Sequence, residues 1–281
     1  MNAGAREAAQ GEVTLIEAQA LADSLAAGKA PLLIQVTAAA LYNQAHLPDA
    51  RLVTPEELVC GIPPATGKLP DREHLIALFN RLGRTPDSDI IVYDDEGGGW
   101  AGRFGWTLDC IGHRRWRYLN GGLHAWAAAG LTLQSGQPPA VISSDNANLS
   151  IDPAPIGEIP DILAAIDHCS SVILDVRSAE EYRGERRAAA RVGHIPGAVN
   201  YDWLLMKDFD DHQRLKADLQ NELAAIGVDG NKPIITHCQT HHRSGLSYMV
   251  GRLFGYDIRA YHGAWSEWGN REDTPIETPG P

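Results

Sequence analysis

The chain has 281 residues, 44% of them hydrophobic, which is enough for two domains of ordinary size with packed cores. A net charge of -12 disfavours nucleic acids and acidic membrane surfaces as partners, so an anionic substrate would need a locally positive site. No apolar run approaches the length of a membrane span, and the first residues carry no apolar signal-peptide segment, so we expect a cytoplasmic protein.

The first half of the chain alternates predicted helices and strands. In chain order we expect a helix over 17–25, strands over 32–36 and 90–93 separated by a helix over 71–82, a helix over 100–111, a strand over 116–119 and a helix opening at 121. Residues 131–155 then become rich in proline, serine and asparagine, which is typical of an exposed linker.

The second half repeats this order, with a helix over 159–168, a strand over 171–176, a helix over 211–226 and a strand over 234–237. Short motifs repeat as well, since 193–198 resembles 45–50 and 262–268 resembles 120–126. We therefore predict an internal duplication, with a first domain over 1–130, a linker over 131–155 and a second domain over 156–281. Each domain is expected to be an α/β unit with a mostly parallel β-sheet flanked by helices.

One of the four cysteines differs from the others. Cys60, Cys110 and Cys169 are far apart, form no CxxC pair and are expected to be reduced and inert. Cys238 instead follows a predicted strand and opens a polar loop that leads into a helix. Loop amides, the helix N-terminus and nearby Arg243 favour the thiolate form of Cys238. This pattern predicts a nucleophile rather than a buried structural cysteine.

The duplication provides a comparison for this loop. Aligning the predicted strands places Asp94 opposite Cys238, and two carboxylates with three glycines take the place of the basic loop. We therefore expect the first domain to lack a nucleophile, to support the second domain and to line one side of the cleft.

Three motifs together resemble the rhodanese (thiosulfate sulfurtransferase) family. They are DVRSAEEY at 175–182, GHIPGA at 193–198 and the loop CQTHHR at 238–243, and GAWSEWG at 263–269 fits as well. The resemblance covers nearly the whole chain in the tandem form, with two rhodanese-like domains of which the first is inactive. The loop is similar to that of the tandem rhodaneses of pseudomonads and Azotobacter.

The resemblance implies a thiosulfate:cyanide sulfurtransferase. The Cys238 thiolate would take sulfane sulfur from a small anionic donor such as thiosulfate and pass it, as a persulfide, to a thiophilic acceptor such as cyanide or a thiol. Cys238 and Arg243 would be the catalytic residues, with Arg243 fixing the loop and adding positive potential. The substrate would be bound by Gln239, Thr240, His241, His242, Ser244 and Arg183, and neither a metal nor a cofactor would be needed.

The sequence departs from the family pattern in three places. The vertebrate thiosulfate enzymes have basic residues directly after the cysteine, where Gln239 and Thr240 stand here. The Cys-Gly-Ser/Ala-Gly loop of mercaptopyruvate sulfurtransferases is also missing. A second arginine of the vertebrate enzymes falls at Glu181, with Arg183 two residues on. These departures leave the physiological donor open.

Other functions compete with this one. A Cdc25-like phosphatase or arsenate reductase needs five residues between its cysteine and arginine, whereas four separate Cys238 from Arg243. A sulfur-relay protein, delivering persulfide sulfur to a protein partner or to cofactor assembly, would share the chemistry, so the sequence leaves it open. A non-catalytic binding module would fit the first domain alone, and a metal site at Cys-x-x-His-His lacks a further ligand.

Overall fold

The structure, a computed structural model, describes residues 14–140 and 143–278. The N-terminal stretch considered for a signal peptide, and residues 141–142 of the expected linker, lie outside these ranges. In the described part of the chain, no helix is both long and apolar enough to cross a membrane.

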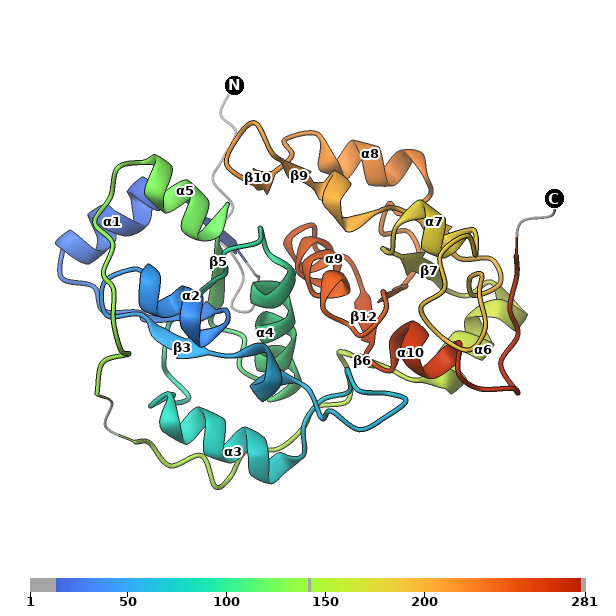
Figure 1. The fold of residues 1–281 in the computed structure, drawn as a ribbon, viewed down its shortest axis with the longest axis horizontal. Coiled ribbons are helices and arrows are strands. Elements are labelled where there is room, and N and C mark those ends of the chain that lie inside the picture. The colour runs from blue at the N-terminus through green and yellow to red at the C-terminus, as the bar shows by residue number, and fades with distance from the viewer. Residues whose placement is uncertain (1–13, 141–142, 279–281) are drawn as a thin grey trace.

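The first domain is built on a five-stranded sheet in which all neighbours are parallel (Figure 1). The strand order is β1 (Thr14–Ile16), β5 (Trp116–Leu119), β4 (Ile90–Tyr93), β2 (Leu32–Val36) and β3 (Arg51–Val53). Its helices are α1 (Ala18–Ala26), α2 (Ala39–Gln44), α3 (Arg72–Arg81), α4 (Gly99–Cys110) and α5 (Gly122–Ala128), with a short 3-10 helix η1 (Pro55–Leu58). All four residues of β4 are buried, as expected for a parallel strand covered on both faces.

The second domain repeats this arrangement. Its parallel sheet has the order β6 (Ile156–Gly157), β12 (Ile258–Tyr261), β11 (Ile234–His237), β7 (Val172–Asp175) and β8 (Val199–Asn200). Its helices are α6 (Ile159–His168), α7 (Ala179–Tyr182), α8 (Leu219–Ala225), α9 (Arg243–Leu253) and α10 (Ala264–Trp268). Numbered within each domain, the strands follow one order in both sheets. The predicted duplication and the predicted α/β fold class are therefore confirmed.

One predicted helix is much shorter than expected. The pattern over 211–226 predicts a helix, but only α8 (Leu219–Ala225) forms there. Upstream, β10 (Arg214–Leu215) pairs antiparallel with β9 (Lys207–Asp208), which follows a 3-10 helix η2 (Trp203–Met206). The Asp208 carboxylate accepts hydrogen bonds from the N–H groups of Asp210 and Asp211, at 2.9 and 3.1 Å. This local turn bonding competes with helix formation.

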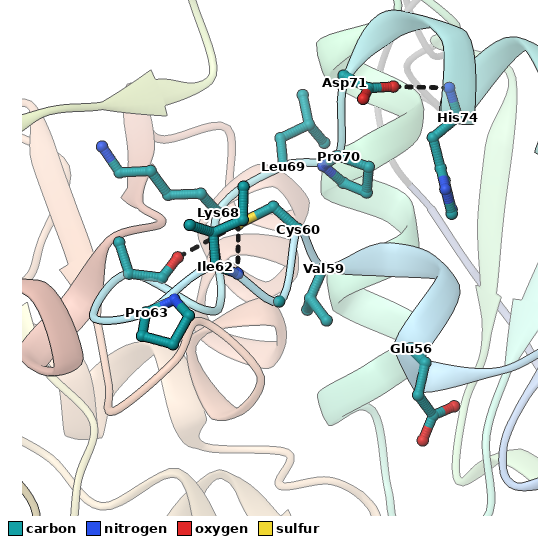
Figure 2. A pocket seen from close by; sticks show the side chains of 12 residues that line it. Glu56, Val59, Cys60, Ile62, Pro63, Lys68, Leu69, Pro70, Asp71 and His74 are labelled. Atoms are coloured by element: carbon teal, nitrogen blue, oxygen red, sulfur yellow. Dashed lines mark hydrogen bonds between the residues drawn. The ribbon is translucent and has the colours of Figure 1, made fainter.

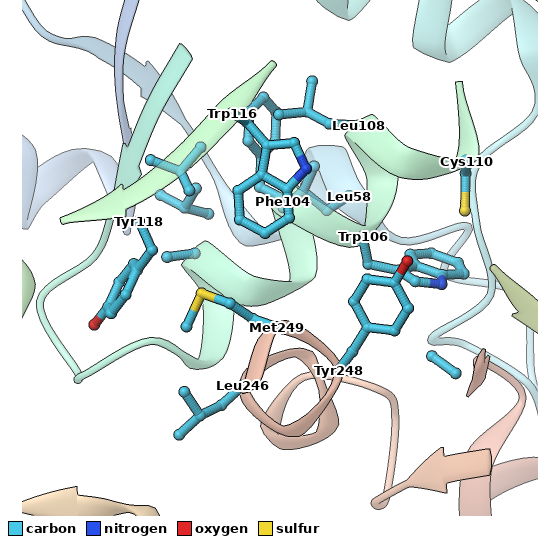
Figure 3. Close-up of a cluster of buried hydrophobic side chains, with 14 of the residues drawn as sticks. Leu58, Phe104, Trp106, Leu108, Cys110, Trp116, Tyr118, Leu246, Tyr248 and Met249 are labelled. Carbon is cyan, nitrogen blue, oxygen red and sulfur yellow. The ribbon is translucent and has the colours of Figure 1, made fainter. Parts of the chain in front are cut away.

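Helices α4 and α9 join the two domains, and their N-terminal turns meet (Figure 1). A Cβ added at Gly102 would lie 2.2 Å from the carbonyl oxygen of Gly245, and one added at Gly245 would lie 2.4 Å from the nitrogen of Arg103. Only glycine permits backbones to approach this closely. Figure 3 shows the continuous core around this contact, with Trp106 of α4 facing Tyr248 of α9. The loops that precede the two helices are consequently brought together.

A buried carboxylate also links the domains. Asp109, on α4, accepts hydrogen bonds from the indole N–H of Trp116 at 3.0 Å and from the hydroxyl of Tyr248 at 2.8 Å. The guanidinium of Arg252, on α9, donates to the same carboxylate at 2.7 Å. Because a buried carboxylate needs such partners, this network fixes the relative position of the two helices.

Candidate active site

Cys238 directly follows β11 and begins the loop that leads into α9. The residue is only 1% exposed, and its Sγ accepts a hydrogen bond from the Ser244 hydroxyl, 3.5 Å away. The start of α10 holds the loop, because the N–H of Trp265 donates to the carbonyl of Cys238 at 3.0 Å. The sulfur thus lies beside the N-terminus of an 11-residue helix, where the partial positive charge of the helix favours an anion.

His241 shapes this loop from the inside. It has a φ of 57°, is fully buried, and places its Nδ1 2.8 Å from the Ser244 hydroxyl. Its ring lies edge-on to Trp106, with 4.5 Å between the ring centroids. Burial, followed by the positive charge of Arg103, lowers the pKa of His241 well below its usual range. His241 is therefore a neutral side chain that orients Ser244, which in turn contacts Cys238.

His242 faces the first domain. Its ring stacks on Trp100 of α4 at a centroid distance of 4.3 Å, and Trp203 approaches its edge at 5.5 Å. Its Nε2 is in close contact with a carboxylate oxygen of Glu96, from the loop that precedes α4. The expectation that the first domain lines one side of the site is thus met by two side chains, Glu96 and Trp100.

Arg243 forms a two-bond ion pair with Glu181. The nitrogen–oxygen distances are 2.6 and 3.0 Å, and the Glu181 side chain is only 6% exposed. Burial alone would lower the pKa of Arg243, but the hydrogen bonds and charge of Glu181 raise it above its usual value. Arg243 therefore ties the loop of residues 238–243 to α7, and the adjacent Glu181 carboxylate largely neutralises its positive charge.

A second buried ion pair lies behind the loop. Arg177 binds the Asp175 carboxylate, with 2.6 Å between Nη2 and Oδ2, and donates to the carbonyl of Gly193 at 2.9 Å. Its guanidinium also covers the ring of Trp265 at 4.2 Å. Burial would raise the pKa of Asp175, but His237 and Arg177 outweigh it and lower that pKa. These contacts join the ends of β7 and β11 to the 193–198 motif.

Comparison with known proteins identifies the family. Residues 17–129 and 159–271 each match the rhodanese-like domain. The chain belongs to the rhodanese family. It is 46% identical to a thiosulfate sulfurtransferase of Azotobacter vinelandii over 247 residues, covering 88% of this chain and 90% of that protein. It is 44% identical to a thiosulfate sulfurtransferase of Pseudomonas aeruginosa over 264 residues, covering 94% and 96%.

More distant relatives share the fold of this rhodanese. A sulfur carrier protein, TtuD of Thermus thermophilus, is 29% identical over 249 residues, covering 84% of this chain and 86% of that protein. The crystal structure of YnjE superposes with a TM-score of 0.81 at 22% identity, covering 95% of this chain and 69% of the other. An anaerobic ergothioneine biosynthesis enzyme from Chlorobium limicola has a TM-score of 0.83 at 20% identity, covering 95% and 70%.

The other residues predicted to bind substrate in this rhodanese differ in their position relative to Cys238. Gln239, half-buried at the loop, donates through its amide to the carbonyl of Ala188 at 2.8 Å. Thr240 packs through its backbone against Gly67 of the first domain, where an added Cβ would lie 2.1 Å from its carbonyl oxygen. Arg183 is exposed and pairs with Glu185 at 2.7 Å. In the described residues, no hydrogen bond or ion pair joins Arg183 to the loop of residues 238–243.

Sequence reasoning missed a buried cation behind the loop. Arg103, on α4, is fully buried and donates to the carbonyls of Gly67 and Leu58, at 2.8 and 2.5 Å. Its guanidinium lies 4.5 Å from the ring of Trp106. Burial lowers its pKa to about 10, so the side chain is still charged at neutral pH. The only sequence signal was an arginine on the predominantly apolar helix α4. Its role is to hold the segment that packs behind Thr240.

The remaining thiols and one large pocket lie elsewhere. All four cysteines are free, and Cys60 donates to the carbonyl of Ala65 at 3.4 Å. It lines a pocket of about 750 Å³ formed by residues between Glu56 and His74, none of which belongs to the loop of residues 238–243 (Figure 2). Across residues 14–140 and 143–278, no three His, Cys, Asp or Glu side chains are grouped to hold a metal ion.

Proposed function

We propose that this rhodanese is a thiosulfate sulfurtransferase that carries sulfur on Cys238. The supporting observation is the position of the thiol, at the end of a central parallel strand and beside the N-terminus of α9. The two relatives that share 44 and 46% of their residues with it over most of its length are both thiosulfate sulfurtransferases. Catalysis then proceeds in two half-reactions.

In the first half-reaction, the Cys238 thiolate attacks the sulfane sulfur of thiosulfate. The sulfur–sulfur bond of the donor breaks, its electron pair leaves with sulfite, and Cys238 becomes a persulfide. In the second, a thiophilic acceptor such as cyanide attacks the outer sulfur and the Cys238 thiolate leaves. Loop amides and the N-terminus of α9 stabilise both anionic forms of the sulfur, as an oxyanion hole stabilises developing charge.

The loop supplies donor contacts in this proposal. Gln239, Thr240 and His242 are half-buried around the nearly inaccessible Cys238, so the donor must approach past them. Ser244 lies beside the sulfur itself. Arg243 acts by fixing the loop, because Glu181 matches its charge. We place the reaction in the cytoplasm, with a small anionic donor and a small acceptor as partners.

A sulfur-relay role is the second candidate. The supporting observation is the likeness to TtuD, which is a sulfur carrier protein. In addition, Leu204, Leu205 and Phe209 are 41, 51 and 59% exposed in the segment next to Trp203, which contacts His242. In a relay, the outer sulfur of the Cys238 persulfide would pass to a protein thiol instead of to cyanide, and the Cys238 thiolate would leave. The phosphatase alternative is disfavoured because the loop is one residue too short.

Intact-protein mass spectrometry tests the proposal. After incubation with thiosulfate, we expect a gain of one sulfur atom on Cys238, and cyanide should then remove it as thiocyanate. Mercaptopyruvate is the matched alternative donor. A protein that stays unmodified with thiosulfate would refute the proposed activity. A persulfide that protein thiols remove much faster than cyanide would favour the relay.

A further inference from the structure

The acidic loop of the first domain is held by the second domain through both the backbone and the side chain of Glu96. Lys207, on β9, donates its ammonium to the carbonyl oxygen of Glu96 and lies 3.9 Å from the ring of Trp203. The Glu96 side chain accepts a hydrogen bond from the N–H of Trp100 at 3.1 Å and contacts Nε2 of His242 through the same oxygen. The Glu96 carboxylate is therefore held by the first turn of α4 independently of its contact with His242.

The three glycines after Glu96 make this contact possible. A Cβ added at Gly97 would lie 2.6 Å from Cδ of Lys207, and one added at Gly99 would lie 2.8 Å from Nε2 of His242. Gly97 and Gly98 also have φ values of 83° and 106°. Side chains at these positions would push the second domain away from the loop. Residues 96–99 therefore form a surface that lies directly against the loop of residues 238–243.

His242 is consequently fixed on three sides. Trp100 covers one face of its ring, Trp203 approaches an edge, and the Glu96 carboxylate occupies Nε2. Its Nδ1 makes no hydrogen bond within residues 14–140 and 143–278, so this nitrogen is left for a ligand. A carboxylate on one ring nitrogen of a histidine sets the orientation of the ring. Thiosulfate only accepts hydrogen bonds, so Nδ1 can bind it only as an N–H donor, with both ring nitrogens carrying protons.

We propose that Glu96, in the domain without a nucleophile, is a positioning residue of the active site. It acts through His242, whose ring it holds so that Nδ1 faces the incoming donor. This inference rests on the proposed function, because it takes His242 as a donor-binding side chain. The first domain thus contributes to donor binding as well as to support.

Steady-state kinetics with thiosulfate tests this role against simple electrostatics. Removing a negative charge near the site should by itself lower the KM for an anionic donor. If Glu96 positions His242, Glu96→Ala should instead raise the KM by about tenfold, with kcat changed much less. Glu96→Gln keeps an oxygen that can accept both hydrogen bonds, so it should restore part of the loss. Asp95→Asn is the matched control, since it removes the same charge one residue away.

A double-mutant cycle separates positioning from loss of structure. In the His242→Gln background, Glu96→Ala should no longer raise the KM, because its target is already gone, and only the electrostatic lowering of the KM should remain. Persulfide formation at saturating thiosulfate and a cooperative melt show that each variant is folded. A KM for Glu96→Ala that is unchanged or lower, or effects that add in the double variant, would overturn the inference. Failure of the wild-type protein to form a persulfide would instead count against the proposed function.

Discussion

The two loops that follow the central strands show how one architecture came to serve two purposes. After β11, the sulfur of Cys238 lies beside the Ser244 hydroxyl in the first turn of α9. After β4, the Asp94 carboxylate occupies the equivalent place and accepts hydrogen bonds from the N–H groups of Gly98 at 2.8 Å and Ala101 at 2.9 Å. The turn after β4 in the first domain therefore binds an anion through its backbone N–H groups, and that anion is a carboxylate of its own.

The environments of the two loops differ in charge as well. Asp94 is fully buried, and burial followed by the charge of Glu96 raises its pKa to about 6, although backbone hydrogen bonds oppose this. In the second domain, burial would raise the pKa values of Asp175 and Glu181. His237 and Arg177 at Asp175, and Arg243 at Glu181, outweigh burial and lower both pKa values. The second domain thus holds carboxylates that are ion-paired near a thiol, while the Asp94 carboxylate of the first domain forms no ion pair within the part of the chain that the structure describes. This difference in charge distinguishes the loop after β11, which carries the thiol, from the loop after β4, which packs against it.

The largest expected effect comes from removing the nucleophile. Cys238→Ala should abolish sulfur transfer, because this thiol alone lies between a central strand and a helix N-terminus among the four free cysteines. Changing Cys60, Cys110 and Cys169 together should leave the rate within a few-fold. Turnover of thiosulfate measures both. Activity that survives in Cys238→Ala would show that the comparison between the loops has been misread.

Loop length should matter next. Inserting one glycine between Cys238 and Arg243 widens the ring of amides from a size that fits sulfur to one that fits phosphate. Since a misplacement of about 1 Å can cost on the order of 100-fold in rate, thiosulfate turnover should fall by about that factor. Binding of tungstate or hydrolysis of a small aryl phosphate should become detectable in protein that still melts cooperatively. Full turnover in this variant would mean that loop length does not select sulfur.

The contact between α4 and α9 should be sensitive to a single methyl group. Gly102→Ala places a Cβ against the Gly245 carbonyl and should cost about 1–3 kcal/mol of unfolding free energy. It should also lower activity, because α9 begins at the catalytic loop. Gly112→Ala adds no clash but strains a φ of 72°, so it should lose stability alone. Urea unfolding and thiosulfate turnover are measured for both variants. Equal activities in the two variants would contradict the idea that the α4–α9 contact affects the loop at Cys238.

The two domains should respond oppositely to pH. Asp94 has a folded pKa of about 6 against a reference value of 3.8, so its stabilising contribution is complete below about pH 4 and is lost as the pH rises through 6. Asp175 and Glu181 have lowered pKa values, so their contribution is present above their unfolded values and is lost as the pH falls. Lowering the pH should therefore reduce the stability that Asp175 and Glu181 give the second domain and increase the stability that Asp94 gives the first.

Asp94→Asn isolates the contribution of the first domain. Relative to the wild type, its free energy of unfolding should rise between pH 5 and pH 8 by on the order of 2 kcal/mol, because the variant has no carboxyl to ionise. Urea melts at the two pH values measure this change, and any constant offset from altered hydrogen bonding cancels. A difference that does not vary with pH would show that Asp94 is ionised throughout this range.

The smallest expected effect is the failure to create a second site. Asp94→Cys should gain no persulfide, because Asp95 and Glu96 lie beside the new thiol and disfavour its anionic form. The position is also covered, with Leu246 and Lys207 of the second domain packed on the following glycines. Mass spectrometry of the Asp94→Cys, Cys238→Ala variant after thiosulfate is the measurement. A persulfide on the first domain would show that a thiol at the end of β4 reacts with thiosulfate even beside Asp95 and Glu96.

Sequence reasoning was most successful where the determining interactions are local. Strands β4 and β11 have the predicted bounds, since short apolar runs between turn signals identify buried strands. The helix expected over 211–226 was wrong in its first half because the turn bonding of Asp208 is not visible as a break in hydrophobic spacing. Arg183 was predicted as a substrate residue by its closeness in sequence to a family position, yet it pairs with Glu185 on the surface.

By itself, the sequence determined the duplication, the α/β class and the placement of a single thiol at a strand end, because each follows from residue type and spacing along the chain. Tertiary structure decided which charges around that thiol remain available. The partner of Arg243 is 62 residues away and that of His242 is 146 residues away. Such pairs depend on how two sheets and two helices pack, and the charge of a side chain in a site depends on the partner that packing brings to it.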